Sequence, residues 1–174
     1  MRRIKLLVCV ICTLVFMASL VGCKAPEPSV KEGKFNFSVT YEVDGEIKTI
    51  SSVFVCKFKE AGKELGGYYV SWDSYIEDKE IESLFPKDRH NCIVVAVNQD
   101  GTIYLDLNLH AKYFMSDPSY EDPYDGKPYM YIMYNDAVAE EKGTYGDTDA
   151  EVLESYGVKL ISYEYDKPVK NTYK

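Results

Sequence analysis

The feature that most constrains the fold is a strict alternation of apolar and polar residues over positions 35–43, followed at once by Asp44-Gly45. A period of two places every second side chain on the same face, as in a half-buried β-strand. Asp-Gly favours a type I′ turn, in which both central residues need positive φ. We therefore expect residues 46–58 to return antiparallel to residues 35–43. This register puts a set of apolar side chains on one face: Phe35, Val39, Ile50, Phe54, Cys56 and Phe58.

Four more strands are predicted downstream. Residues 92–97 are rich in β-branched side chains, turn residues follow at 98–101, and residues 103–109 alternate, so these segments form a second hairpin. Residues 129–134 and 158–165 add two further strands. Short helices are expected at residues 77–85, ending before Pro86, and at residues 148–157, where Thr148 and Glu151 form a capping box and Gly157 ends the helix.

These elements predict a mainly β fold, because the strands follow one another without the βαβ rhythm of a parallel sheet. We expect an antiparallel β-sandwich, or a curved sheet, with two short helices. The length of residues 35–174 suits a single domain with one core.

The first 23 residues carry a separate pattern. Basic residues at positions 2, 3 and 5 precede an uncharged apolar run over residues 6–20, which is the order of a secretion signal. The run ends in Leu20-Val21-Gly22-Cys23, which resembles the lipobox of bacterial surface lipoproteins. The resemblance implies that residues 1–22 are removed and that the Cys23 thiol carries a diacylglycerol. Two or three acyl chains would then hold the chain stably on the outer side of a bacterial membrane.

The alternative for this segment is an uncleaved membrane helix, since residues 4–22 are about long enough to span a bilayer. After Cys23, residues 24–34 hold two prolines and no aromatic residue, a composition typical of a semi-extended tether. We therefore divide the chain into a signal at residues 1–22, a lipidated tether at residues 23–34 and a domain at residues 35–174.

The charge of the chain argues against nucleic acid as a partner. The formal net charge is -8, and removal of the three cationic residues of the signal lowers it to -11. Phosphate backbones are bound through Lys and Arg, so this field has the wrong sign. The acidity is typical of a well-solvated extracellular surface.

Two cysteines remain in the predicted domain, Cys56 and Cys92, each on a predicted strand. In an oxidising location they could form a disulfide, which would stabilise the fold by about 3–4 kcal/mol in the chain-entropy model. The alternative is two buried thiols, because a free cysteine packs as a small apolar residue.

The most unusual segment is residues 116–128, which combines three prolines with carboxylates and tyrosines. As a binding loop it would offer Tyr120 and Tyr124 as stacking faces and Asp122 and Asp125 as hydrogen-bond acceptors or Ca²⁺ ligands. As a connector it would only join two strands. Trp72, the single tryptophan, is either a core residue or part of an exposed lip.

No catalytic or cofactor motif occurs in the sequence. Neither His90 nor His110 has another zinc-ligating residue beside it at the spacing of a zinc site. Both are interpreted as surface or strand-end residues. We therefore expect no enzyme, and no cofactor or metal beyond Ca²⁺ at the acidic loop. The predicted function is a non-catalytic envelope module that binds a glycan, peptide or protein. A lipid or hydrophobe carrier and, with less support, an envelope glycoside hydrolase with paired carboxylates are the alternatives.

Overall fold

The computed structural model describes residues 25–65, 67–86, 91–121, 126–134 and 150–174. Its strands form two antiparallel sheets, one of four strands in the order β3-β2-β1-β7 and one of three in the order β4-β5-β6. The strands are β1 (Glu32–Val43), β2 (Glu46–Glu64), β3 (Gly67–Ile76), β4 (Cys92–Val97), β5 (Gly101–Asp106), β6 (Tyr129–Tyr134) and β7 (Val158–Tyr165).

The β1–β2 hairpin confirms the register predicted from the alternating pattern. Val43 pairs with Glu46 across a two-residue turn, in which Asp44 has φ 52° and Gly45 has φ 82°. Phe35 pairs with Phe54 and Val39 with Ile50, so the predicted apolar side chains share one face. These four residues are buried, and Cys56 is buried with them.

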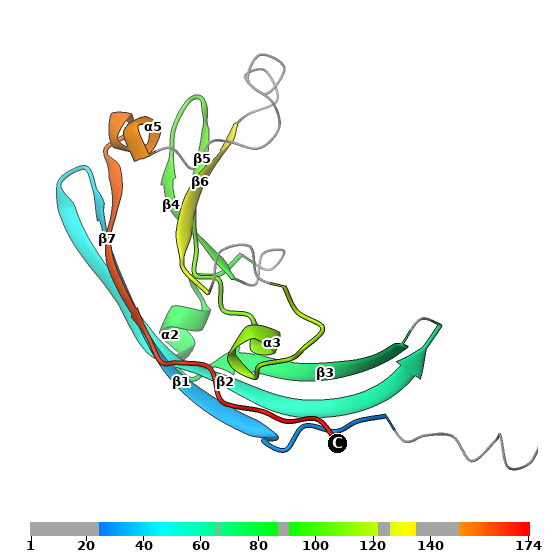
Figure 1. The fold of residues 1–174 in the computed structure, drawn as a ribbon. Coiled ribbons are helices and arrows are strands. Elements are labelled where there is room, and N and C mark those ends of the chain that lie inside the picture. The colour runs from blue at the N-terminus through cyan, green and yellow to red at the C-terminus, as the bar shows by residue number, and fades with distance from the viewer. Residues whose placement is uncertain (1–24, 66, 87–90, 122–125, 135–149) are drawn as a thin grey trace, which may run out of the picture.

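The two sheets face each other as the layers of a mainly β, sandwich-like fold (Figure 1). The four-stranded sheet curves around the inner elements, and the three-stranded sheet stands opposite its upper part in this view. Between them lies one core to which both sheets contribute, with Val39 and Ile50 from one layer and Ile103 and Leu105 from the other. Burial of this apolar surface is what holds the layers together.

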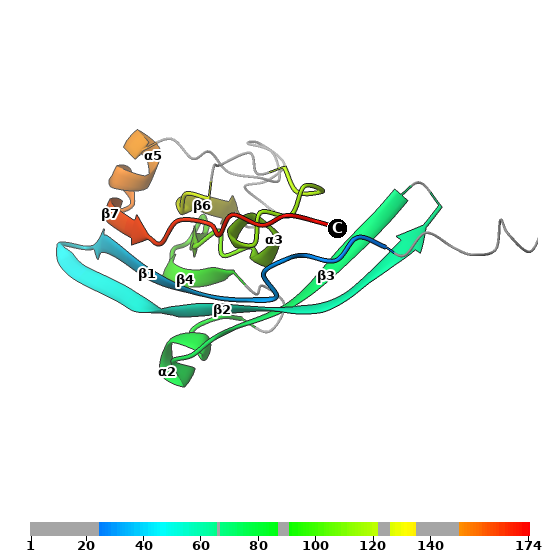
Figure 2. The ribbon, with the colours of Figure 1, turned by 60° about the horizontal axis from the view of Figure 1, so that its bottom comes forward.

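The β2–β3 hairpin is longer than the sequence analysis predicted. We expected the second strand to end at Phe58 and predicted no strand at residues 67–76, whereas β2 continues to Glu64 and pairs with β3 from Phe54 onward. A register shift between Phe58 and Glu60 interrupts this pairing, which disturbs the alternation on which the prediction rested. The end of the hairpin projects beyond the rest of the fold (Figure 2).

Three short helices lie within the described residues, whereas the sequence predicted two. α2 (Lys79–Glu82) is shorter than the predicted helix at 77–85. Its N-cap is Asp78, whose carboxylate accepts hydrogen bonds from the backbone N–H groups of residues 80 and 81. α5 (Ala150–Ser155) lies within the predicted helix at 148–157, while Thr148 is outside the described residues. α3 (Ala111–Phe114) was not predicted, because one turn of helix leaves no periodic pattern.

The folded region begins before Phe35, where the sequence analysis placed its boundary. Pro28 forms an isolated antiparallel bridge with Tyr173, and Ser29 N–H donates to the carbonyl of Thr172 at 2.8 Å. The two ends of the described chain therefore run side by side (Figure 1). Part of the predicted tether is therefore paired with the C-terminal segment, a partner that the composition of residues 24–34 could not indicate. In the described residues, no helix has the length and apolar character needed to cross a membrane.

Of the two alternatives for Cys56 and Cys92, the structure has the second, since both residues are buried free thiols. They belong to different sheets, since Cys56 lies on β2 and Cys92 on β4. Cys92 Sγ donates to Asp106 Oδ2 at 3.2 Å on its own sheet. Burial raises the pKa of the Cys56 thiol to about 12, so this side chain stays a neutral, weakly polar core residue.

Candidate functional site

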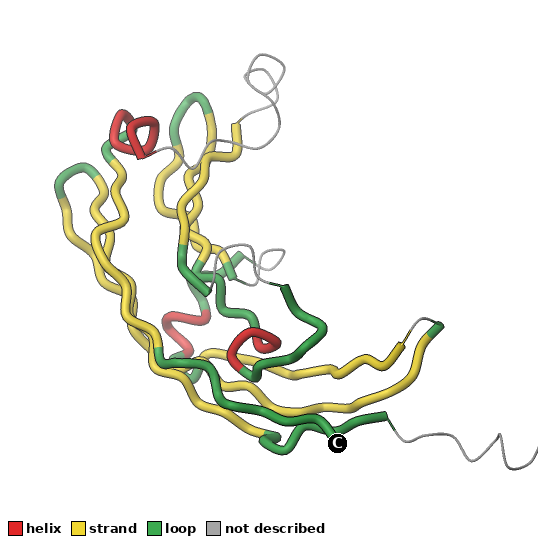
Figure 3. Tube along the Cα trace, viewed as in Figure 1, coloured by secondary structure: helices red, strands yellow, loops and turns green. Residues whose placement is uncertain are grey.

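The candidate site lies where α3 and the chain that follows it approach β3 (Figure 3). α3 is anchored by Phe114, its one buried residue, whose ring is 4.8 Å from that of Phe35 and 5.5 Å from that of Phe54. His110 is the N-cap of the helix, in an extended conformation, four residues after the end of β5. A single buried aromatic side chain therefore fixes the position of the whole turn on the inner face of the curved sheet.

The C-terminal segment holds the end of α3 in place. Val169 N–H donates to the carbonyl of Phe114 at 2.9 Å, and Ser116 Oγ donates to the carbonyl of Val169 at 2.6 Å. Asn171 Nδ2 donates to the carbonyl of Met115 at 3.2 Å. Ser116 has φ 49°, a left-handed conformation that turns the chain sharply away from the helix. The following loop therefore starts from a fixed point.

A buried carboxylate ties this loop to β3. Asp117 is 5% exposed, and its Oδ1 accepts hydrogen bonds from the N–H and hydroxyl of Ser119. Its Oδ2 accepts a hydrogen bond of 3.2 Å from the indole Nε1 of Trp72. Burial, with a smaller contribution from the charge of Asp117, raises the pKa of Tyr173 to about 12. Trp72 is thus neither a core residue alone nor a free lip, because its polar end is fixed by the loop.

A groove of about 390 Å³ opens beside this contact. We call it the β3–α3 groove. Its aromatic walls come from β3 and the loop, and charged or polar groups of both signs stand among them. The lining residues are Glu64, Tyr69, Val70, Ser71, Trp72, His110, Ala111, Lys112 and Tyr120.

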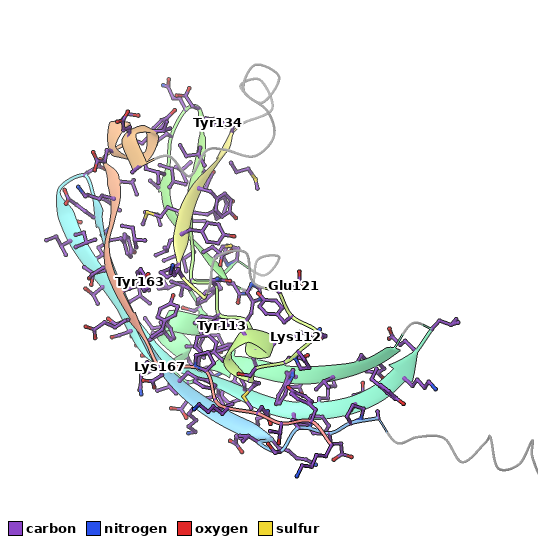
Figure 4. The ribbon with its side chains drawn as sticks, in the orientation of Figure 1. Lys112, Tyr113, Glu121, Tyr134, Tyr163 and Lys167 are labelled. Atoms are coloured by element: carbon purple, nitrogen blue, oxygen red, sulfur yellow. The ribbon has the colours of Figure 1, made fainter. Side chains whose placement is uncertain are left out.

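The side chains of the groove are held by contacts with one another. The rings of His110 and Tyr120 lie 5.4 Å apart, and Lys112 Nζ donates to Ser119 Oγ at 3.3 Å. Lys112 and Glu121 lie beside the loop that follows α3 (Figure 4). Tyr69 lies across Gly62 of β2, where an added Cβ would come within 2.5 Å of the tyrosine ring. The aromatic walls are therefore built into the fold.

A second pocket of about 480 Å³ continues along β3. His110 and Ala111 line both cavities, so the two are neighbours on either side of the start of α3. The second pocket follows Ser74, Tyr75 and Ile76 of β3 and is closed by residues around α2 and β4. Its remaining lining residues are Phe54, Glu82, Phe85, Pro86, Asn91 and Leu109.

Two of the predicted ligand-binding residues, Trp72 and Tyr120, are brought together in the β3–α3 groove. The other three, Asp122, Tyr124 and Asp125, lie outside the described residues. Within the described part of the chain no group of three or more metal-ligating side chains occurs. Glu64 is the only carboxylate among the described residues that line the groove, so these residues provide no facing pair of acids.

No family model, curated protein or solved structure matches the chain.

The sequence analysis missed the groove residues Glu64, Tyr69, His110 and Lys112. His110 was expected to follow a strand over residues 103–109, but β5 ends at Asp106 and His110 is the N-cap of α3. Its place opposite β3 could not be read from the sequence. More than thirty residues separate it from Trp72 in the chain. The available signal was the density of tyrosines, 16 in the chain, which does not distinguish a sheet residue from a groove residue.

Proposed function

We propose that the chain is an extracytoplasmic lipoprotein, held on a bacterial membrane by lipid on Cys23, that binds a ligand without catalysis in the β3–α3 groove. The observation that carries the proposal is the convergence of the loop starting at Ser116 with Trp72 on one concave surface. Long polar loops of this kind are either functional or loose. Here the start of the loop is fixed by the C-terminal segment and by β3.

The lining of the groove suits a polar ligand with apolar faces. Tyr69, Trp72 and Tyr120 offer aromatic surface, while Glu64 and Lys112 offer an acceptor and a donor of opposite charge. Concave sites with a few convergent polar groups are the usual places for ligand recognition. A glycan or a peptide of the cell envelope meets these requirements, since both carry hydrogen-bonding groups beside apolar faces.

The acidity of the chain sets the charge of the partner. A formal net charge of -11 after removal of the signal favours a neutral or basic ligand and opposes nucleic acid. Ca²⁺ at Asp122 and Asp125 remains part of the proposal, because carboxylates are the ligands this ion prefers. Asp117 is not available for that role, since both of its oxygens accept hydrogen bonds within the protein.

The single tryptophan makes the test direct, because Trp72 is the only indole in the chain and it lines the groove. The mature domain is titrated with soluble peptidoglycan fragments and, separately, with a pool of short peptides, while the emission of Trp72 is followed. We expect one of these titrations to give a saturable change. A Tyr120→Ala variant should lose it, because one wall of the groove is removed.

The matched control is Tyr163→Ala. Tyr163 is 41% exposed on β7, outside the groove (Figure 4), so its loss should leave the titration unchanged. If Tyr120→Ala binds as tightly as the parent protein, or if Tyr163→Ala weakens binding equally, the ligand site lies elsewhere. If neither glycan nor peptide changes the emission, the proposal is wrong.

A hydrophobe carrier is supported by one specific feature. An apolar cleft of about 270 Å³ lies between β6, α5 and β7, and Met130, Leu153, Val158 and Leu160 are among its lining residues. The cleft opens at the edges of the two sheets, whereas the space under the four-stranded sheet is filled by the core. Titration with a fluorescent fatty acid, compared with a Leu160→Gln variant, tests this second candidate. Loss of binding in the variant would favour it.

A further inference from the structure

The outer edge of β3 is an open strand edge. β3 is the last strand of its sheet, and among the described residues its backbone hydrogen bonds go to β2 alone. A strand edge presents a row of N–H and C=O groups, which is a template for another strand. The ten residues of β3 offer such a template over about 30 Å, at about 3.3 Å per residue.

β3 carries no basic residue or proline that would protect its edge. Its sequence is GYYVSWDSYI, whereas the opposite edge strand, β7, carries Lys159. Both edge strands have an irregular register with their neighbour, and both contact short helices, α5 at β7 and α2 and α3 at β3. Natural sheets use lysines and prolines to prevent strand addition. The absence of both along the longer of these two edges leaves β3 able to accept a further strand.

Both cavities of the candidate site lie along this same edge. The β3–α3 groove follows Tyr69 to Trp72, and the second pocket follows Ser74 to Ile76. His110 and Ala111 form the opposite wall of both. The edge therefore runs along a trough, with separate spaces for side chains of an extended chain on either side of His110.

We propose that the β3 edge binds an extended peptide as an added strand, with a basic residue at the end nearest Glu64. This inference rests on the proposed function, because it names the ligand of the same groove. Strand addition supplies backbone hydrogen bonds for affinity, and pockets for alternate side chains supply specificity.

Charge decides between a peptide and a second copy of the chain. Glu64 has no ion-pair partner among the described residues, whereas Glu82 at the second pocket is already paired with Lys79. Two copies pairing through β3 would bring together two chains of net charge -11. A basic peptide places a cation beside Glu64, so its binding weakens as salt rises.

The test uses a pool of end-capped octapeptides with lysine at both ends and varied uncharged residues between. Members retained by the immobilised mature domain are sequenced and titrated, with Trp72 emission as the readout. The best peptide is then made in two N-methylated forms, one methylated on the odd-numbered amides and the other on the even-numbered amides. We expect one form to lose at least tenfold in affinity, because its N–H groups can no longer donate to β3.

Two protein variants test the charge. Glu64→Lys should weaken the peptide about tenfold, whereas Glu46→Lys makes the same charge change on the exposed turn side of β2 and should have no effect. A second peptide pool, with glutamate in place of lysine at both ends, should yield no binder. Retention of full affinity by both N-methylated peptides would show that side chains alone bind in the groove, which overturns strand addition while the proposed function stands.

Other outcomes also decide the question. If glycan fragments change the emission of Trp72 and no peptide is retained, the inference is wrong and the binding site survives. If the domain is a dimer in sedimentation and Ser71→Lys makes it monomeric, a second copy occupies the edge and the peptide is excluded. If no probe of either kind binds, both the proposed function and this inference fail.

Discussion

Replacing Phe114 with alanine should both destabilise the domain and displace the candidate site. Phe114 is 1% exposed, and its ring contacts aromatic rings on β1 and β2. Burial of such a side chain contributes about 1.5–3 kcal/mol. A residual cavity of about 50 Å³ would add about 1.2 kcal/mol, at about 24 cal/mol per Å³. Lost aromatic pair geometry adds about 0.5–1.5 kcal/mol. These contributions total about 3.2–5.7 kcal/mol. We expect a loss of about 3–5 kcal/mol, the usual range for Phe→Ala.

Urea unfolding followed by far-ultraviolet circular dichroism measures this loss. With a slope of about 2 kcal/mol per molar urea, the midpoint should fall by about 1.5–2.5 M. The control is Leu84→Ala, because Leu84 is 49% exposed and its truncation should cost less than about 0.5 kcal/mol. The emission of Trp72 in native buffer should also change, since Phe114 anchors the helix that faces it. A midpoint within about 0.3 M of the parent, or about 0.6 kcal/mol at this slope, would refute the central role of Phe114.

Four further outcomes are expected. The native N-terminal peptide should begin at Cys23 with a diacylglycerol adduct, and intact mass showing residues 1–22 still attached would sink the assignment. Thiol counting without reductant should find two reactive thiols, Cys56 and Cys92, in denaturant and neither in the native protein; finding none in denaturant would restore the bridge. Because the folded pKa of Cys56 is raised from 9.0 to about 12, its contribution to stability is complete below pH 9 and is lost as pH rises towards 12. The urea midpoint should therefore fall over that window, and a Cys56→Ala variant should show a smaller fall. Calorimetric titration with Ca²⁺ should give heat that disappears in the Asp122→Ala, Asp125→Ala variant; equal heats would place any calcium elsewhere.

Local pattern was enough to predict the parts of the fold that depend on near neighbours. Asp44-Gly45 set the turn and hence the full β1–β2 register, and β4, β6 and β7 have the bounds that their apolar patterns predicted. β3 was not predicted although it is rich in β-forming residues. The register shift in β2 and Gly67 interrupt the alternation of apolar and polar residues that would have indicated a further strand. α3 escaped because a helix of four residues is stabilised by the burial of Phe114 and not by its own sequence.

The candidate site, too, could be predicted from the sequence only in part. The sequence singled out the polar loop beginning at Ser116, with its tyrosines, and it drew attention to the single Trp72. It could not show that Asp117 reaches Trp72, that His110 faces β3, or that Cys56 and Cys92 lie on separate sheets. Alternation and turn chemistry act over two to four residues and are written in the sequence itself. Which strand edge stays open, and which distant side chains meet beside it, depends on how two curved layers pack around a shared core, and that is decided by the burial of surface from the whole chain at once.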